Sequence, residues 1–591
     1  MDFDVVVLDT WTLESVTELA ARAVDGGPAV LPVRCDGGLV LVGPLTGPGT
    51  SACVACAEHA RIHALPGHTP HTGQVMGGSV PPTVAALVER LVERLAERPQ
   101  DGVMWAIRGE SLEVSTHRVR PFGGCRVCAP LPDDSPRPIT IASHPVTGTG
   151  LREANPRTAG ADGLREVLLD WRVGPVLRLF RWGSRSLPLA SAELPGAADS
   201  SEAGYGRAED FADAERVALF EALERLTGMT PRGSRTVVRA AHAELDPHVA
   251  VDPATLGLHE PELTDHPAFR LTPYAPGLPL AWVHGWSLTH GRDRLVPEEL
   301  VYWRLRGRRS IYDSSNGCGL GSSLAEAILY GLFEVAERDA FLMAWYARTP
   351  LRRIATPTED PQICRLADRL GSLGHDLLLF DATNDFGVPA VLSMIRRRVP
   401  DPRRPNALFA AGAHHDPLTA VRSAVVEVYI NARNAADPRI VSFDPDRLRP
   451  MLEDPTLVRT VDDHVFVNAL AEAAPWHSFL SGEETPVSWR EVWPRRPAVP
   501  DLGEHLSEWV AQLAARGLEV IAVDQSEPVT RERLGLHAAK VIVPGSLPMT
   551  FGHVYRRTRG LPRLLEVPAR LGRLPAPPRY DDLPFHPHPF P

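Results

Sequence analysis

Two helical segments of the sequence repeat the pattern Glu-x-x-Glu-Arg. The pattern comprises Glu221, Glu224 and Arg225 in the first segment, and Glu334, Glu337 and Arg338 in the second. Residues three apart on a helix project from one face. Four carboxylates converging from two helices would repel one another unless cations lay between them. Oxygen ligands select Mg²⁺, which in proteins often also holds substrate phosphates. The pattern predicts a magnesium-dependent nucleotide site without a Walker loop.

Surface ion pairing is the alternative interpretation, because Glu-Arg neighbours are common on solvated helix faces. The surroundings favour the metal site, since apolar residues leave little of either helix as a polar outer face. These residues are Ala218, Phe220, Leu223, Phe333, Val335 and Ala336.

The second helix follows a glycine-rich stretch, SSNGCGLGSS (314–323), which predicts a turn leading into a helix N-terminus. Free N–H groups and the helix dipole make such a start favourable for a phosphate. The stretch lacks the Gly-Lys-Ser/Thr ending of a P-loop. Ser323 and Glu326 also have the spacing of a capping box, so helix initiation remains an equal alternative to ATP contact.

Four cysteines form two CxxC pairs, Cys53 with Cys56 and Cys125 with Cys128. Four thiolates bind zinc with no open coordination position, as a structural site requires. Buried free thiols or a redox pair are the alternatives. The unpaired cysteines Cys35, Cys318 and Cys364 are expected to be small core residues.

Composition narrows the function classes. The net charge of -11 provides no global basic field to attract nucleic acid or an anionic membrane. No signal peptide or apolar run of membrane-spanning length is found in the sequence, so a cytoplasmic location is expected. Arginine supplies every basic charge except that of Lys540, and we attach no function to that single lysine.

A mixed α/β fold with two domains is predicted. Two hairpin patterns (29–45 and 103–119) flank a helical pattern (81–99) near the N-terminus. The segment APLPDDSPRP (129–138) predicts a linker, because it is rich in proline and acid and has no periodicity. We therefore expect a first domain at 1–130, a linker at 131–140 and a second domain at 141–591.

The second segment, SSNGCGLGSSLAEAILYGLFEVAERDAF, resembles the signature of YcaO-domain proteins, which are ATP-dependent enzymes that activate peptide backbone amides. The resemblance extends over most of 141–591. Further blocks occur in the family's order: DAERVALFEALERLTG, PLAWVHGWSLTHGRDRLVPEELVY, GAHHDPLTAVRSAVVEVY and HAAKVIVPGSLPM.

The resemblance implies a role for each matching residue. The magnesium ligands of the family fall on Glu221, Glu224, Glu334 and Glu337. Its nucleotide contacts fall on Asn316, Ser322, Glu326 and Arg338, and less securely on Arg225 and Arg422. The family often has a serine four residues before the first glutamate, where this chain has Val217, and that departure puts one phosphate contact in doubt.

The segment GPLTGPGTSACVACAEHARIH resembles part of the E1-like, zinc-bearing component of azoline-forming systems. About 130 residues are too few for a complete E1-like domain together with the winged-helix module that grips a leader peptide. The resemblance therefore implies a partial E1-like domain, a separate leader-binding partner protein and a homodimer.

The sequence ends in PFHPHPFP, with prolines at 587, 589 and 591. Within the family, Pro-x-Pro-x-Pro resembles the mark of the azoline-forming branch, whose chain end enters the active site. Proline stiffens the arm, so the Pro591 carboxylate could be held at a fixed depth as a catalytic base. The alternative is a disordered proline-rich tail.

Together these resemblances imply cyclodehydration of Cys, less often Ser or Thr, in a ribosomally made precursor peptide, with ATP, Mg²⁺ and a structural Zn²⁺. A thiopeptide or linear azole pathway is expected. One rival is a YcaO enzyme with an external nucleophile, which would form a thioamide or an amidine. The other rival is an inactive docking scaffold.

Overall fold

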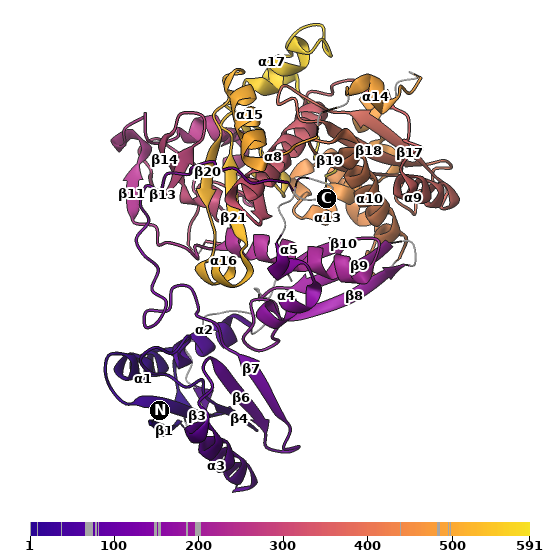
Figure 1. Ribbon diagram of the computed structural model, residues 1–591. Coiled ribbons are helices and arrows are strands. Elements are labelled where there is room, and N and C mark those ends of the chain that lie inside the picture. The colour runs from indigo at the N-terminus through magenta and orange to yellow at the C-terminus, as the bar shows by residue number, and fades with distance from the viewer. Residues whose placement is uncertain are drawn as a thin grey trace.

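The computed structural model describes residues 2–590 except 9, 37, 65–74, 77–79, 81, 147–150, 152–154, 185–186, 196–201, 306, 438, 481–484, 495 and 497. The N-terminal part forms its own layer of sheet and helices, and the remainder builds a larger α/β assembly above it (Figure 1). The mixed α/β class predicted from the sequence is confirmed.

The N-terminal sheet has the order β1-β3-β4-β6-β7, with β1 parallel to β3 and the other pairs antiparallel. Both predicted hairpins and the predicted helix are present. The strands are β1 (Phe3–Leu8), β3 (Ala29–Asp36), β4 (Leu39–Val42), β6 (Val103–Arg108) and β7 (Val114–Arg118), and the helices are α1 (Leu13–Val24), α2 (Val54–Ala64) and α3 (Pro82–Glu97). A short ribbon pairs β2 (Thr10–Trp11) with β5 (Val75–Met76).

The segment predicted as a linker contains no helix or regular strand, and the larger part of the molecule holds it in place. The carboxylate of Asp134 accepts hydrogen bonds from the His284 N–H at 2.8 Å and from the Ser234 hydroxyl at 3.1 Å. Further along, the Ser143 hydroxyl donates to Asp501 at 2.6 Å. The connection is therefore an extended strap along the larger part (Figure 1).

In the described residues, the larger part contains three sheets of three or more strands and the two-stranded pair of β12 (Leu258–His259) and β22 (Arg557–Arg559). A three-stranded sheet has the order β10-β9-β8, a six-stranded sheet runs β11-β13-β20-β21-β15 with β14 paired to β13, and a four-stranded sheet runs β16-β17-β18-β19. Their strands are β8 (Arg178–Ser184), β9 (Leu187–Glu193), β10 (Ala203–Arg207), β11 (Val238–Ala241), β13 (Pro279–Ser287), β14 (Arg292–Pro297), β15 (Cys318–Gly321), β16 (Arg352–Ile354), β17 (His375–Asp381), β18 (Ala390–Arg397), β19 (Ala407–Ala413), β20 (Ile521–Asp524) and β21 (His537–Ile542).

Five long helices cover these sheets: α5 (Phe211–Met229), α8 (Leu324–Tyr346), α9 (Pro361–Ser372), α10 (Pro417–Ala436) and α15 (Leu502–Ala514). Helix α5 packs on β9 and β10, α8 packs on β15 and β21, and α9 and α10 pack on the four-stranded sheet. Helix α8 is buried along most of its length and belongs to two hydrophobic clusters. A helix buried in this way is a rigid support for polar side chains.

Shorter elements complete the fold. They are α4 (Ala161–Leu168), α6 (Pro261–Thr264), α7 (Glu298–Val301), α11 (Pro445–Leu448), α12 (Pro450–Glu453), α13 (Val461–Val467), α14 (Trp489–Val492), α16 (Pro528–Leu534), α17 (Arg563–Arg570), β12 (Leu258–His259) and β22 (Arg557–Arg559). In the described part of the chain, no helix combines the length and hydrophobicity needed to cross a membrane.

The glycine-rich stretch before α8 differs from the predicted turn, because Cys318–Gly321 is strand β15, paired antiparallel with β21. A Cβ atom on Gly319 would lie 2.1 Å from the Ala327 carbonyl oxygen. The glycine therefore permits the strand to lie directly against α8. Sequence alone does not distinguish such a glycine from a loop glycine.

Candidate active site and metal centre

The two Glu-x-x-Glu-Arg helices, α5 and α8, both pack against β15 and bring their carboxylates close together. Burial raises the pKa of Glu224 well above its usual value, and the nearby charges of Glu334 and Glu221 raise it further. Interaction across the two helices is what the sequence pattern predicts. Three carboxylates in one desolvated region carry a negative charge that a cation would stabilise.

The two carboxylates of the second helix have different partners. Glu334 pairs with Arg338 at 2.5 Å, while its Oε2 is buried and has no hydrogen-bond partner in the described structure. Glu337 accepts a hydrogen bond from the Ala413 N–H at 2.9 Å. Burial, together with the charge of Glu427, raises the pKa of Glu337 to about 8. An orphaned carboxylate oxygen and a carboxyl group held partly neutral both fit a site that a divalent cation completes.

The glutamates surround the candidate metal site without closing it. Among the described residues, only the four cysteines bring three or more ligand atoms within 4.8 Å of one another. Mg²⁺ usually keeps several waters and binds one or two carboxylates plus substrate phosphates. The open spacing of the glutamates therefore suits magnesium held jointly by protein and nucleotide.

A cavity of about 540 Å³ opens beside these glutamates. Its lining includes Glu221 and Glu224 from α5, and Ser322 and Glu326 from the start of α8. Such a volume is typical of a site for a small organic ligand. Val217, the departure from the family pattern, also lines the cavity. Arg216 lines it too, with a buried Nε that has no partner in the described structure, and the sequence analysis missed this residue.

The capping box predicted at the start of α8 is half formed. The Ser323 hydroxyl accepts a hydrogen bond from the Glu326 N–H at 3.2 Å, which is the expected N-cap. The Glu326 carboxylate accepts from the Ser322 N–H at 3.1 Å instead of from the Ser323 N–H. Because Glu326 also faces the cavity, helix initiation and ligand contact are compatible roles for it.

Asn316 and Arg338 line a second, smaller cavity of about 50 Å³. Arg338 donates to the Asn316 amide oxygen at 2.7 Å, and this amide oxygen also accepts from the Met549 N–H at 3.1 Å. Lys540 lies in the same cavity, is 1% exposed and pairs with Asp313 at 3.0 Å. The single lysine of the chain is therefore a buried cation next to the predicted site. Its rarity in the sequence was a usable signal.

The remaining predicted contacts lie in different surroundings. Arg225 pairs with Glu221 at 2.9 Å and with Glu202 at 3.2 Å, so it lies among the glutamates of the candidate site. Arg422 pairs with Asp360 at 2.6 Å, at the start of α9. In the described part of the chain it has no contact with the predicted glutamates, and its nucleotide role stays a prediction.

Two further charged residues join the site from elements that the sequence analysis did not connect with it. Glu427 on α10 raises the pKa of Glu337 through its negative charge, and it pairs with Arg207 of β10 at 3.4 Å. Glu427 follows Arg422 by five residues inside a block that the resemblance already marked. A search for acidic residues in each marked block could have found it.

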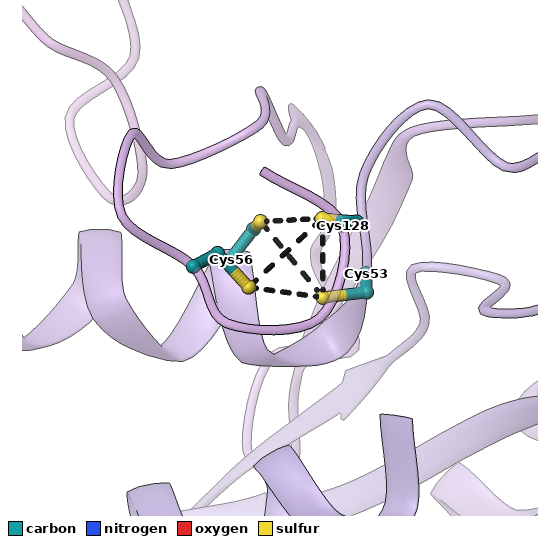
Figure 2. Close-up of side chains that lie close together, drawn as sticks. Cys53, Cys56 and Cys128 are labelled. Carbon is teal, nitrogen blue, oxygen red and sulfur yellow. Dashed lines mark hydrogen bonds between the residues drawn. The ribbon is translucent and has the colours of Figure 1, made fainter. Parts of the chain in front are cut away.

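The four cysteines converge as predicted, from the start of α2 and from the loop after β7 (Figure 2). Five of the six Sγ–Sγ separations run from 3.1 Å, between Cys56 and Cys128, to 3.9 Å, between Cys125 and Cys128. A tetrahedron with Zn–S bonds of about 2.3 Å has S–S edges of about 3.8 Å. Hydrogen bonds to Cys125 raise the pKa of Cys53 and Cys56, while hydrogen bonds to its neighbours lower the pKa of Cys125. The geometry fits a tetrahedral metal ion.

The C-terminal arm, residues 584–590, threads into the centre of the larger part, where the chain end is marked in Figure 1. Its backbone carbonyls accept side-chain hydrogen bonds at three successive positions: Trp345 Nε1 donates to His586 O at 3.1 Å, Asn468 Nδ2 to Pro587 O at 2.9 Å, and His464 Nδ1 to His588 O at 3.0 Å. Phe590 packs edge-on against Phe341 of α8. The alternative of a disordered tail is wrong for these residues.

The arm also reaches the predicted nucleotide site. Burial holds the pKa of His588 well below its usual value, and the charges of His464 and Arg338 lower it further. Arg338 is the arginine that pairs with Glu334, so the arm and the α8 carboxylates share one electrostatic environment. Pro591 itself lies outside the described residues.

Residues 205–547, more than half of the chain, match the family model described as YcaO cyclodehydratase, ATP- and Mg²⁺-binding. The chain belongs to the YcaO family. All four predicted magnesium ligands and all six predicted nucleotide contacts fall inside the matched range, whereas the cysteine cluster and the C-terminal arm fall outside it.

Two curated relatives match part of the YcaO chain. One is an uncharacterized protein in the tfuA 3′ region of Rhizobium leguminosarum bv. trifolii, 28% identical over 282 residues, which cover 45% of this chain and 61% of the relative. The other is an uncharacterized protein of Methanothermobacter thermautotrophicus, 29% identical over 268 residues, which cover 44% and 63%. The chain thus spans about six tenths of the length of these relatives.

Two solved structures share the fold of the YcaO chain. A heterocyclase in complex with substrate and cofactor superposes with a TM-score of 0.80 at 21% identity, covering 100% of this chain and 81% of that one. The heterocyclase TruD gives a TM-score of 0.67 at 20% identity, covering 98% and 78%. The first match includes the N-terminal part, so the fold of the whole chain is that of a heterocyclase.

Proposed function

We propose that this protein is an ATP- and Mg²⁺-dependent peptide cyclodehydratase. It would convert Cys residues, less often Ser or Thr, of a ribosomally made precursor peptide into thiazolines or oxazolines. The observation that carries this proposal is the group of half-buried carboxylates on α5 and α8, in which the Oε2 atom of Glu334 is buried and has no described partner. Family membership supports a nucleotide and Mg²⁺ as what completes the group.

The proposed reaction removes one water from the peptide. The substrate thiol or hydroxyl attacks the carbon of the preceding amide, that amide's oxygen departs as phosphate, and the ring closes with a C=N bond. Mg-ATP, when bound, supplies the phosphoryl group that makes this oxygen a leaving group. Glu221, Glu224, Glu334 and Glu337 would hold the metal, while Arg338 and the start of α8 would orient the phosphates.

The C-terminal arm would supply the base. The hydrogen bonds from Trp345, Asn468 and His464 hold residues 586–588 in a buried path that leads toward Arg338. A carboxylate at the end of such an arm would be desolvated, which raises its pKa and makes it a better proton acceptor. We assign that role to the Pro591 carboxylate, which takes the proton released on ring closure.

The N-terminal part would bind a structural Zn²⁺ through Cys53, Cys56, Cys125 and Cys128, in keeping with the near-tetrahedral thiol spacing. We retain the division into a partial E1-like domain (1–130), a linker (131–140) and a YcaO domain (141–591). A separate leader-binding protein would deliver the precursor peptide, and the enzyme would act as a homodimer.

The direct test is the intact mass of a Cys-containing precursor peptide after incubation with the protein, its leader-binding partner and Mg-ATP. Loss of one water mass per ring, dependent on ATP, is expected. Glu224→Gln should abolish it, because the amide cannot replace an anionic metal ligand, while Glu93→Gln on the exposed face of α3 should have no effect.

The same spectra distinguish the rivals. Incorporation of sulfur or of an amine, instead of water loss, would assign the site to an enzyme that uses an external nucleophile. A peptide of unchanged mass together with no ATP turnover would favour a docking scaffold. Either result would overturn the proposed reaction.

A further inference from the structure

A short run of arginines lies outside the candidate active site. Five of the nine residues in RRRVPDPRR (396–404) are arginine, in a chain whose net charge is -11. The run connects β18 to β19 at one end of the four-stranded sheet. The side chain of Arg396 belongs to another environment, since its charge acts on His477. Three of the other four, Arg397, Arg403 and Arg404, line a cavity.

A cavity of about 260 Å³ lies beneath this run, and we call it the arginine-rimmed cavity. Arginines form its rim and apolar residues its floor. The lining residues that matter here are Arg397, Arg403, Arg404, His375, Leu408 and Phe443. His375 is 8% exposed, and its Nδ1 is buried with no hydrogen-bond partner in the described structure. His375 therefore adds a buried ring nitrogen without a described partner to the wall of the cavity.

The rim has unbalanced positive charge. Arg398 pairs with Asp376 at 2.8 Å, and Arg404 lies 3.7 Å from Asp401. Within the described residues, neither Arg397 nor Arg403 has an acidic partner at ion-pair distance; Arg397 donates only to the Pro405 carbonyl oxygen, at 3.4 Å. The guanidinium groups of Arg397 and Arg403 can therefore donate hydrogen bonds to carboxylates, whose geometry matches that of arginine.

Exposed apolar side chains lie next to the arginine-rimmed cavity in the sequence. Leu373 is 45% exposed, Val399 77% and Ile440 40%. Each is next to, or two residues from, a residue that lines the cavity. Apolar groups mixed with arginine are typical of a peptide- or protein-binding surface. The side chains that line the cavity include no exposed aromatic platform of the kind that stacks nucleic-acid bases.

We propose that the arginine-rimmed cavity binds an acidic linear segment of the substrate peptide, with one apolar side chain of that segment inserted between Leu408 and Phe443. The cavity admits one or two side chains, so it suits a short linear segment better than the face of a folded protein. Negative charge on the segment would match the unpaired arginines. The identity of the occupant rests on the proposed function, but the chemistry of the site does not.

Helix α10 connects this cavity with the candidate active site. Three alanines at the C-terminal end of α10 line the cavity: Ala432, Ala435 and Ala436. Near the middle of the same helix, the charge of Glu427 raises the pKa of Glu337. The helical rise from Glu427 to Ala436 is about 14 Å, which an extended peptide covers in about four residues. A segment anchored in the cavity would hold the reacting residues within reach of the metal site and so lower the KM for the peptide.

The test uses fluorescence anisotropy of the full-length protein with three labelled synthetic peptides. The first is rich in glutamate with a central Leu-Phe pair, the second has that pair replaced by Gly-Gly, and the third has every glutamate replaced by lysine. The first should bind about tenfold or more tightly than either of the others. No ATP is present, so failure of this binding is distinguishable from failure of the proposed reaction.

Two variants test the location. Arg403→Glu with Arg404→Glu should weaken binding of the first peptide about tenfold or more, whereas Arg90→Glu with Arg108→Glu makes the same charge change on exposed N-terminal residues and should leave it unchanged. Ala435→Trp should fill the cavity and weaken binding with the rim intact. Thermal melting confirms that each variant is folded.

Three results would overturn the proposal: equal binding of the three peptides, equal loss with the two charge-reversal pairs, or tighter binding of a single-stranded oligonucleotide at the same arginines. The last would assign the rim to nucleic acid.

Discussion

At the scale of single residues, the carboxylates of α8 determine how the site responds to protons and metal. The pKa of Glu337, raised to about 8, means that the folded protein binds a proton there more tightly than the unfolded chain does, whose carboxyl has a pKa near 4.5. This contribution to the free energy of unfolding is full below pH 4.5 and is lost as the pH rises toward 8.

We therefore expect Glu337→Gln to flatten the decline in stability of the metal-free protein between pH 6 and 8. The effect is on the order of 2 kcal/mol for a half-buried group. Mg²⁺ should raise the melting temperature more at pH 8 than at pH 6, because protons no longer compete for the carboxylate. Melting curves of wild type, Glu337→Gln and the exposed control Glu93→Gln provide the measurement. A variant with the wild-type slope would show that Glu337 ionises normally.

At the scale of elements, close contact between strand and helix positions the carboxylates. A Cβ atom on Gly206 of β10 would lie 1.7 Å from the Ala214 carbonyl oxygen of α5. Gly206→Ala must therefore push α5 from its sheet, and we expect a loss of about 3 kcal/mol or more in the free energy of unfolding. Gly277→Ala, where a Cβ atom would have nothing within 4 Å, should be nearly neutral in the same chemical denaturation series. Similar effects for both variants would refute this packing.

The C-terminal arm is the second element whose position matters. Asn468 holds it by donating to Pro587 O and to His464 O, both at 2.9 Å. Asn468→Ala should lower kcat for the peptide by about tenfold or more, with the KM for ATP unchanged, since the arm loses its register but the nucleotide cavity does not change. Asn431→Ala removes a comparable amide-to-carbonyl bond, to Phe409 O, away from the arm and serves as the control. Equal kinetics for the two variants would contradict a positioning role.

Sequence predicted some elements better than others, for physical reasons. Apolar periodicity and paired glutamates were sufficient to place α5 and α8 and to predict that their carboxylates interact. Strand β15 was not predicted, because glycines selected for close backbone approach look like turn glycines. Glu427 and Lys540 were missed although both lie in blocks that the resemblance marked, because the sequence does not say which residues of a block face the site.

At the scale of the whole molecule, the cysteine cluster supports the junction between the two parts. Phe122, three residues before Cys125, stacks on His59 of α2 and lies under the Arg232 guanidinium of the larger part. Nearby, Arg120 pairs with Glu527 at 3.1 Å. Loss of the metal would release the loop that carries both Arg120 and Phe122.

We expect Cys128→Ser, or treatment with a zinc chelator, to produce a separate unfolding transition at lower temperature, because a structural zinc ion bound there would supply on the order of 10 kcal/mol of folding free energy. Cys364→Ser, at a half-buried cysteine outside the cluster, should melt like wild type. Calorimetry together with metal analysis of the purified protein makes the measurement. A single unchanged transition in a zinc-free protein would exclude a structural metal.

The CxxC spacing predicted that these four cysteines converge, whereas the role of the proline-rich segment 129–138 as a domain linker stays a prediction. Its docking could not be predicted, because the hydrogen bonds of Asp134 and Ser143 depend on residues more than a hundred positions away. The C-terminal arm was predicted only in part. The proline pattern predicted that the arm is stiff, but the hydrogen bonds that Trp345, His464 and Asn468 donate to it depend on the tertiary fold.

The central claim is that the peptide amide oxygen leaves as phosphate. The most direct measurement uses a precursor peptide labelled with ¹⁸O at the carbonyl before its reactive cysteine, followed by mass analysis of peptide and inorganic phosphate after turnover with Mg-ATP. We expect the label to be lost from the peptide and recovered in phosphate, one atom per ring. Recovery of the label in water, or its retention in a peptide that has nevertheless changed mass, would contradict it.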